Sequence, residues 1–174
     1  MDITLLVFYA VLALGISFIC SILEAVVLSV PHTYIAVLQK EGKKSGNIWS
    51  QLKDDDAVKP LTSILTLNTI AHTMGAAGVG SQVQSVWGEE YLTVASIILT
   101  IAVLFFSEIV PKTLGTAYWK QLAPITGILL TYLVKILMVI IIPIQMLKSI
   151  LPKGSNTLVT RDDVVAIVDL GEEE

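Results

Sequence analysis

Three long apolar runs limit the possible folds of this chain more strongly than any other feature. They cover about residues 3–29, 61–84 and 91–110. As an α-helix, each can cross the roughly 30 Å hydrocarbon core of a bilayer. Of the 174 residues, 54% are hydrophobic and 15% are charged, whereas soluble domains carry about 25% charged residues. The fold class is therefore predicted to be all-α integral membrane, with three transmembrane helices in contact with the lipid bilayer and no nucleic-acid partner.

The distribution of basic residues predicts the orientation in the membrane. Five lysines lie in the polar loop between the first two runs: Lys40, Lys43, Lys44, Lys53 and Lys59. The N-terminal end has only Asp2, and the short turn near Trp87 has only Glu89 and Glu90. Because Lys and Arg favour the cytoplasmic side, we expect a multi-pass protein of the plasma membrane with its N-terminus outside and its C-terminus in the cytoplasm.

A fourth apolar stretch covers residues 122–147, and hydropathy alone would make it a fourth span. Lysines lie on both sides of it, so both ends favour the cytoplasm. Lys135 lies near its middle, where a span would place the charge at the centre of the bilayer. Pro124, Gly127 and Pro143 also interrupt it. We therefore predict juxtamembrane helices over about 112–151, either a belt or a re-entrant hairpin, within a membrane domain of residues 1–152.

Two polar regions lie outside these runs. In the first loop, Ile48, Trp49 and Leu52 have helical spacing, which predicts a short amphipathic piece on the membrane surface with Trp49 as an interface anchor. At the other end, residues 153–174 are predicted to be a linker and an acidic amphipathic helix that leads into a further cytoplasmic domain.

Glu108 and Pro111 at the end of the third run indicate a cation site. A carboxylate at membrane depth is costly, and packing alone does not reward it. Pro111 has no N–H, so it cannot bond to the carbonyl of Ser107. In lipid such a carbonyl needs another polar partner or a cation. The sequence therefore predicts two hard oxygens side by side, followed by Lys112.

The first helix brings hydroxyl groups toward this site. Ser17, Ser21 and Glu24 are four and three residues apart, so they share one helical face. Interhelical packing or hydrogen bonding back to the helix also explains the serines. Glu24 lies near the cytoplasmic end, where its side chain could instead reach water.

The second helix presents Asn68 and His72 on one face, with Thr69 on its flank. Asn68 offers a carbonyl oxygen to a hard cation, whereas His72 suits a transition metal or proton transfer. An interhelical hydrogen bond explains His72 equally well. The run of small residues from Gly75 to Gly80 predicts that another helix, or a second copy, approaches closely there.

These segments, in this order, resemble the transmembrane domain of the CorC/CorB–cyclin M (CNNM) family of magnesium transporters. Ser17–Glu24 resembles the family's serine-rich segment, and Leu65–His72 resembles its Asn-bearing helix. Ser107–Lys112 is similar to its Glu-x-x-Pro-Lys segment, and Thr160–Glu174 resembles the acidic helix before its paired CBS domains.

The resemblance implies a homodimer that exports Mg²⁺ in exchange for Na⁺ from an inward-facing site. Carried over by position, the metal ligands are Ser17, Ser21, Leu67, Asn68, Ser107 and Glu108, with backbone carbonyls as the donors of Leu67 and Ser107. In this family a CBS pair, which would follow the present residues, binds ATP with Mg²⁺ and regulates transport.

This chain departs from the family pattern at three positions: Leu23 replaces a serine, Leu67 a glycine and His72 an asparagine. These changes leave open whether the ion is Mg²⁺, Na⁺ or Mn²⁺. They also motivate an alternative function, a membrane-anchored cation sensor or regulatory subunit with a degenerate site. An intramembrane hydrolase using Ser21 or Ser107 with His72 is disfavoured, since the sequence has no Gly-x-Ser-x-Gly or His-Glu-x-x-His motif. The chain is therefore expected not to be an enzyme.

Overall fold

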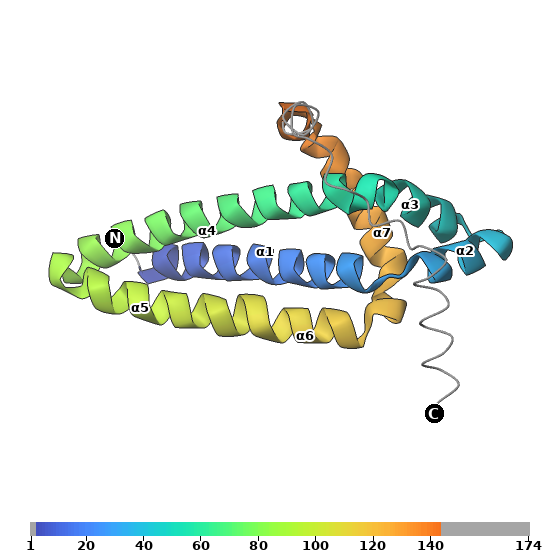
Figure 1. The fold of residues 1–174 in the computed structure, drawn as a ribbon. Helices are drawn as coiled ribbons and strands as arrows, with labels where there is room; N and C mark the ends of the chain where they lie inside the picture. The colour runs from blue at the N-terminus through green and yellow to red at the C-terminus, as the bar shows by residue number, and fades with distance from the viewer. Residues whose placement is uncertain (1–2, 144–174) are drawn as a thin grey trace, which may run out of the picture. The chain divides into compact units, whose positions relative to one another are not determined.

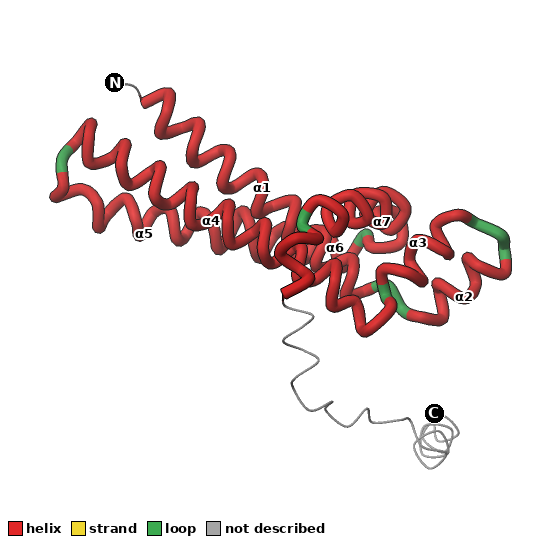
Figure 2. Tube along the Cα trace, turned by 90° about the horizontal axis from the view of Figure 1, so that it is seen from above, coloured by secondary structure: helices red, strands yellow, loops and turns green. Residues whose placement is uncertain are grey.

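Three long helical segments run side by side in the computed structural model, which describes residues 3–143 (Figure 1 and Figure 2). They are α1 (Ile3–Ser29), α4 (Val58–Trp87) and a third segment made of α5 (Leu92–Ala102), η3 (Val103–Ile109) and α6 (Val110–Ala117). Helix α4 is antiparallel to the other two (Figure 1). Every regular element in the described range is helical, which confirms the predicted all-α class. Residues up to Ile141 form one compact unit.

Two of the three long segments have the length and hydropathy of membrane spans: Ile3–Ser29 and Glu89–Ala117. Helix α4 has 30 residues, about 45 Å at the usual rise, and is less apolar than the other two. Large apolar side chains on the bundle, such as Phe8, Ile98 and Phe106, are exposed. An apolar surface of this extent suits contact with lipid rather than water.

Helices α1 and α4 approach closely at two glycines of the small-residue run. A Cβ atom on Gly75 would collide with the Cβ of Ala13, and one on Gly78 would lie 2.6 Å from the ring of Tyr9. The predicted close helix approach is therefore confirmed at these positions, with α1 as the neighbour. Gly80 has no atom within 4 Å of such a Cβ, so that glycine is not needed for the contact within this chain.

The third helix does not end near residue 110, as the sequence predicted, but continues through Pro111 to Ala117. Residues Val103–Ile109 form a π-helix, in which the N–H of Val110 bonds to the carbonyl of Phe105. This wide turn takes up the break in α-helical bonding, and Pro111 then lies in the first turn of α6, where proline is tolerated.

The first polar loop forms a helical hairpin, and the short helical piece predicted at Ile48, Trp49 and Leu52 is part of its second helix. It contains α2 (His32–Lys40), α3 (Lys44–Leu52) and the short helix η1 (Asp54–Ala57). Helix α4 begins at Val58, so Pro60 lies inside its first turn rather than before it. Proline fits there because the first N–H groups of a helix have no intrahelical partner. At its other end, α4 extends to Trp87 and η2 (Glu89–Tyr91) connects it to α5.

Trp49 was predicted to anchor the chain at the membrane interface, and this prediction is wrong. Its side chain is 0% exposed. The indole N–H donates a hydrogen bond at 2.9 Å to the carbonyl of Ala123, which lies in helix α7 (Trp119–Ile136). Gly127 permits this close approach, because a Cβ there would lie 3.2 Å from the indole nitrogen. A large ring with a satisfied N–H therefore joins α3 to α7.

Helix α7 crosses the end of the bundle at which α1 ends (Figure 1) and contacts α1, α3 and α4. It is not among the segments with the length and hydropathy of a span. Lys135 lies in its last turn and is exposed. The juxtamembrane position of this helix stays a prediction. The predictions for residues 144–174, including the linker and the acidic helix, concern residues that the structure does not describe.

The glycine contacts generate a stability prediction. Gly75→Ala should lower the free energy of unfolding by about 1–3 kcal/mol because its methyl group overpacks the α1–α4 contact. The matched variant Gly80→Ala should leave stability unchanged or raise it by up to about 1 kcal/mol, since alanine favours a helix. Thermal unfolding in detergent measures both. Equal midpoints for the two variants would show that the α1–α4 contact is looser than described.

Candidate cation site

Glu108 is the centre of the candidate site. It lies in the π-helical turn η3, and 23% of its side chain is exposed. One carboxylate oxygen, Oε1, accepts a hydrogen bond from Nδ2 of Asn68 at 3.4 Å, and the other, Oε2, lies 3.1 Å from Nζ of Lys112. A single carboxylate therefore joins α4 to the third helix.

Lys112 extends this cluster to α1. Its ammonium lies 3.2 Å from Oε2 of Glu24 as well as beside Glu108, so it bridges two carboxylates. The bridge exists because the third helix continues through Pro111, which places Lys112 one turn after Glu108 on the same face. Four residues singled out from the sequence are thus brought together: Glu24, Asn68, Glu108 and Lys112.

The hydroxyl of Ser17 lies 2.6 Å from Nε2 of His72, and the two form a hydrogen bond between α1 and α4. This contact is the interhelical hydrogen bond considered for His72. The polar face of α1 therefore lies between its neighbours, since Ser17 reaches α4 while Glu24 reaches α6. Ser21 lies on the same face and is buried.

A serine beside a histidine is also the arrangement of a nucleophile and its base. Ser17 is 0% exposed, so a substrate could not reach its hydroxyl. The two serines considered for a hydrolase, Ser21 and Ser107, have no hydrogen bond to His72. The geometry therefore does not support a hydrolase.

Two buried side-chain oxygens on α1 and α4 have no hydrogen-bond partner: Oγ of Ser21, and Oδ1 of Asn68, whose Nδ2 donates to Glu108. Leaving a buried polar atom unpaired costs about 1–3 kcal/mol. Hydroxyl, amide and carboxylate oxygens are the donors that hard cations such as Mg²⁺, Ca²⁺ and Na⁺ accept. The chemistry of these side chains therefore fits a hard cation.

The side chains of three residues singled out from the sequence have contacts of their own, and the backbone carbonyls expected as donors at Leu67 and Ser107 stay a prediction. The hydroxyl of Ser107 donates to the carbonyl of Leu14 at 3.1 Å and so fixes η3 against α1. The side chain of Leu67 lines a separate apolar cavity of about 110 Å³ between α1 and α4. Thr69 is exposed and bonds back to the carbonyl of Leu65 at 2.8 Å, which places its hydroxyl outside the site.

A cavity of about 320 Å³ adjoins Glu108. It lies between α1, α4 and the third helix and is mostly apolar, with His72, Thr100 and Glu108 as its polar members. Its lining residues are Ala13, His72, Ala76, Leu99, Thr100, Val103, Leu104 and Glu108. The carboxylate therefore faces a space that can hold water or an ion rather than a closed core.

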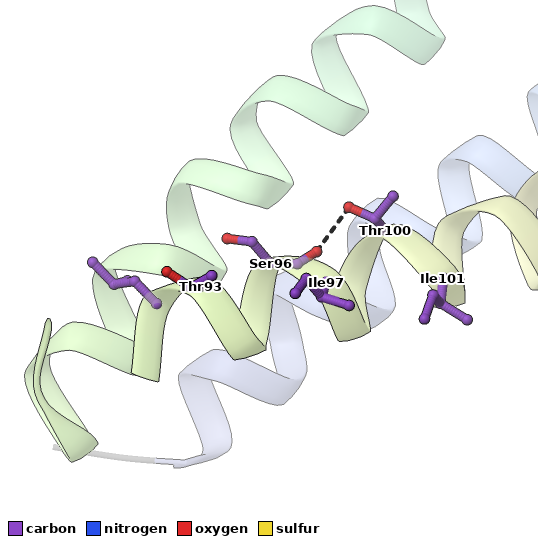
Figure 3. Close-up of a pocket in the computed structure, with 6 residues that line it drawn as sticks. Thr93, Ser96, Ile97, Thr100 and Ile101 are labelled. Atoms are coloured by element: carbon purple, nitrogen blue, oxygen red, sulfur yellow. Dashed lines mark hydrogen bonds between the residues drawn. The ribbon is translucent and has the colours of Figure 1, made fainter. Parts of the chain in front are cut away.

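A larger hollow of about 470 Å³ lies along α5, farther toward the turn between α4 and α5 (Figure 3). It is lined by Leu92, Thr93, Ser96, Ile97, Thr100 and Ile101. The hydroxyl of Thr100 is satisfied by the carbonyl of Ser96 at 2.7 Å. Because its lining has no titratable side chain, this hollow lacks the chemistry of a cation site.

Within residues 3–143, no group of three or more His, Cys, Asp or Glu side chains is placed to hold a metal ion. A cation at Glu108 would therefore depend on amide and hydroxyl oxygens in addition to the carboxylate. Sequence reasoning also missed Gln82 of α4, which is buried and has an unpaired Oε1. Its one signal was an amide in a membrane-length helix.

Comparison with known proteins identifies a family and a relative that this chain resembles. The family described as the cyclin M transmembrane N-terminal domain matches residues 8–174. A curated relative, the UPF0053 protein sll1254 of Synechocystis sp., is 27% identical over 175 residues. That alignment covers 100% of this chain and 49% of the relative, so the chain spans about half the length of this relative.

The Ser17–His72 hydrogen bond generates a second stability prediction. Ser17→Ala leaves Nε2 of His72 without its partner and should lower the free energy of unfolding by about 1–3 kcal/mol. Thr69→Val should change it by less than about 0.5 kcal/mol, because its hydroxyl is exposed and bonds only within its own helix. Chemical or thermal unfolding in detergent compares the two. A loss in Thr69→Val as large as that in Ser17→Ala would contradict the assignment.

Proposed function

This chain belongs to the cyclin M transmembrane-domain family, whose members are membrane proteins related to magnesium transport, and we propose that it carries Mg²⁺ through a site at Glu108. One observation carries the proposal. Glu108 lies in a helical segment of membrane-spanning length, adjoins a cavity between three helices and accepts a hydrogen bond from Asn68, whose buried amide oxygen has no partner.

The proposed ligands are oxygens from all three helices. Glu108 supplies its carboxylate, and Ser21 and Asn68 supply the unpaired hydroxyl and amide oxygens. Half a turn of the Asn68 amide about its last bond would exchange Nδ2 for Oδ1, so that Oδ1 and Glu108 could bind one cation between them. Ser17 can donate its proton to His72 and keep its lone pairs for the ion. Mg²⁺ retains several waters in such sites, and the adjoining cavity offers room for them.

The remaining features follow from the family resemblance. We propose that transport is export from the cytoplasm driven by Na⁺ entry, across the plasma membrane, with the N-terminus outside. We also propose that two copies form a homodimer and that a CBS pair, following residue 174, binds ATP with Mg²⁺ and controls transport. Two alanines of the small-residue run on α4, Ala76 and Ala77, are exposed and offer a surface for a second copy.

One observation favours the second candidate, a cation sensor or regulatory subunit. The ammonium of Lys112 already pairs with Glu108, so the carboxylate has a cationic partner from the chain itself. If that pair is permanent, the site is degenerate and metal does not bind there. Calorimetry on the purified chain distinguishes the candidates, since a sensor with a degenerate site binds neither Mg²⁺ nor Na⁺ at Glu108.

Replacement of the central carboxylate tests the transporter. Glu108→Gln should lower Mg²⁺ flux into proteoliposomes by about tenfold or more, because an ionic ligand is worth more than one neutral hydrogen bond. The control is Glu90→Gln, which makes the same change at an exposed residue of η2. Elution as a single folded species verifies both variants. Unaltered flux in Glu108→Gln would refute the proposed function.

A further inference from the structure

We propose that Lys112 is a tethered counter-cation that competes with a divalent metal for Glu108 and withdraws toward Glu24 when the metal binds. This inference rests on the proposed function, because it concerns the same carboxylate. It assigns Lys112 the role of a specificity-determining residue rather than a ligand.

The ammonium of Lys112 lies between two carboxylates and contacts both. Nζ lies 3.1 Å from Oε2 of Glu108 and 3.2 Å from Oε2 of Glu24, so a small rotation of the lysine side chain would favour one carboxylate over the other. The Lys112 side chain is 44% exposed, whereas that of Glu108 is 23% exposed. The lysine side chain is therefore the more accessible of the two and has more room to change its rotamer than the carboxylate does.

A metal ion and the ammonium compete for the same carboxylate. Oε1 of Glu108 faces the amide of Asn68, and Oε2 faces Lys112. A cation bound to this carboxylate is repelled by an ammonium at contact distance. At a given distance this repulsion is twice as large for a divalent ion as for a monovalent one. Lys112 at Glu108 therefore disfavours Mg²⁺ more strongly than Na⁺.

Glu24 makes the competition reversible. With Lys112 held by Glu24, the carboxylate of Glu108 is free to bind metal, and the ammonium remains paired. When the metal leaves, the returning ammonium prevents Glu108 from being a bare charge at membrane depth, which is a costly state. The lysine thus lowers the affinity of Glu108 for the metal and stabilises the metal-free carboxylate. Both effects favour release of the ion, which transport requires.

The test is calorimetric titration of the purified full chain with MgCl₂, at low and at high NaCl. Lys112→Gln should raise the Mg²⁺ affinity about fivefold or more, a usual size for coupling between two ligands. It should raise the Na⁺ affinity less. Lys120→Gln is the matched control, because Lys120 lies over the ring of Trp119 rather than at the site. It should leave both affinities unchanged.

Two further variants keep the test decisive if Lys112→Gln does not fold. Lys112→Arg retains the charge, and its planar fork can bind a carboxylate in two places, so it should lower the Mg²⁺ affinity. Glu24→Gln leaves Glu108 as the one carboxylate beside Lys112 and should also lower the Mg²⁺ affinity. In the Lys112→Gln background, Glu24→Gln should have a smaller effect than in the parent, since its main action is through the lysine.

The outcomes separate this inference from the proposed function. If Glu108→Gln keeps the parent Mg²⁺ affinity, the transport site itself is refuted. If Glu108→Gln abolishes binding but Lys112→Gln binds Mg²⁺ no more tightly than the parent, only the role of Lys112 is overturned. Additive effects of Glu24→Gln and Lys112→Gln would overturn it as well. If Lys112→Gln does not fold, an unchanged Mg²⁺ affinity in Lys112→Arg would likewise overturn the role of Lys112.

Discussion

A polar group within an apolar helix bundle must find its partner inside the bundle, because lipid offers none. At the level of Glu108 this requirement connects all three long helices: Asn68 of α4 donates to the carboxylate, and Lys112 joins it to Glu24 of α1. The close approach of α1 and α4 at Gly75 holds their polar faces together. The arrangement pairs the charges of Glu24, Glu108 and Lys112 but leaves side-chain oxygens of Ser21 and Asn68 without a partner.

Much of this site could be predicted from the sequence, since the cost of a carboxylate or an amide in an apolar helix depends on that helix alone. Helical spacing likewise placed Ser17, Ser21 and Glu24 on one face. Contacts between distant segments could not be predicted. The burial of Trp49 depends on α7, since its hydrogen-bond partner Ala123 lies 74 residues later in the chain. The pairing of Ser17 with His72 depends on how the two helices are rotated about their axes.

The proline at the end of the third run shows a different limit. The apolar run predicted a helix end near residue 110, just before Pro111, which lacks the donor that an α-helix interior needs. Whether it ends a helix depends on the turn before it, and here that turn is widened to a π-helix. Lys112 therefore follows Glu108 by one helical turn, and its ammonium lies 3.1 Å from that carboxylate. The transporter and the sensor place the same atoms in the same positions and differ in whether this lysine moves.

The widened turn at Val103–Ile109 also has a meaning for how such a helix can arise. A π-turn within an α-helix accommodates one surplus residue while the flanking turns keep their register. After this turn the helix still brings Gly115 against α1, where a Cβ would lie 2.7 Å from the Cβ of Ala25. A single inserted residue could thus widen the turn that carries Glu108 while α6 keeps its contact with α1.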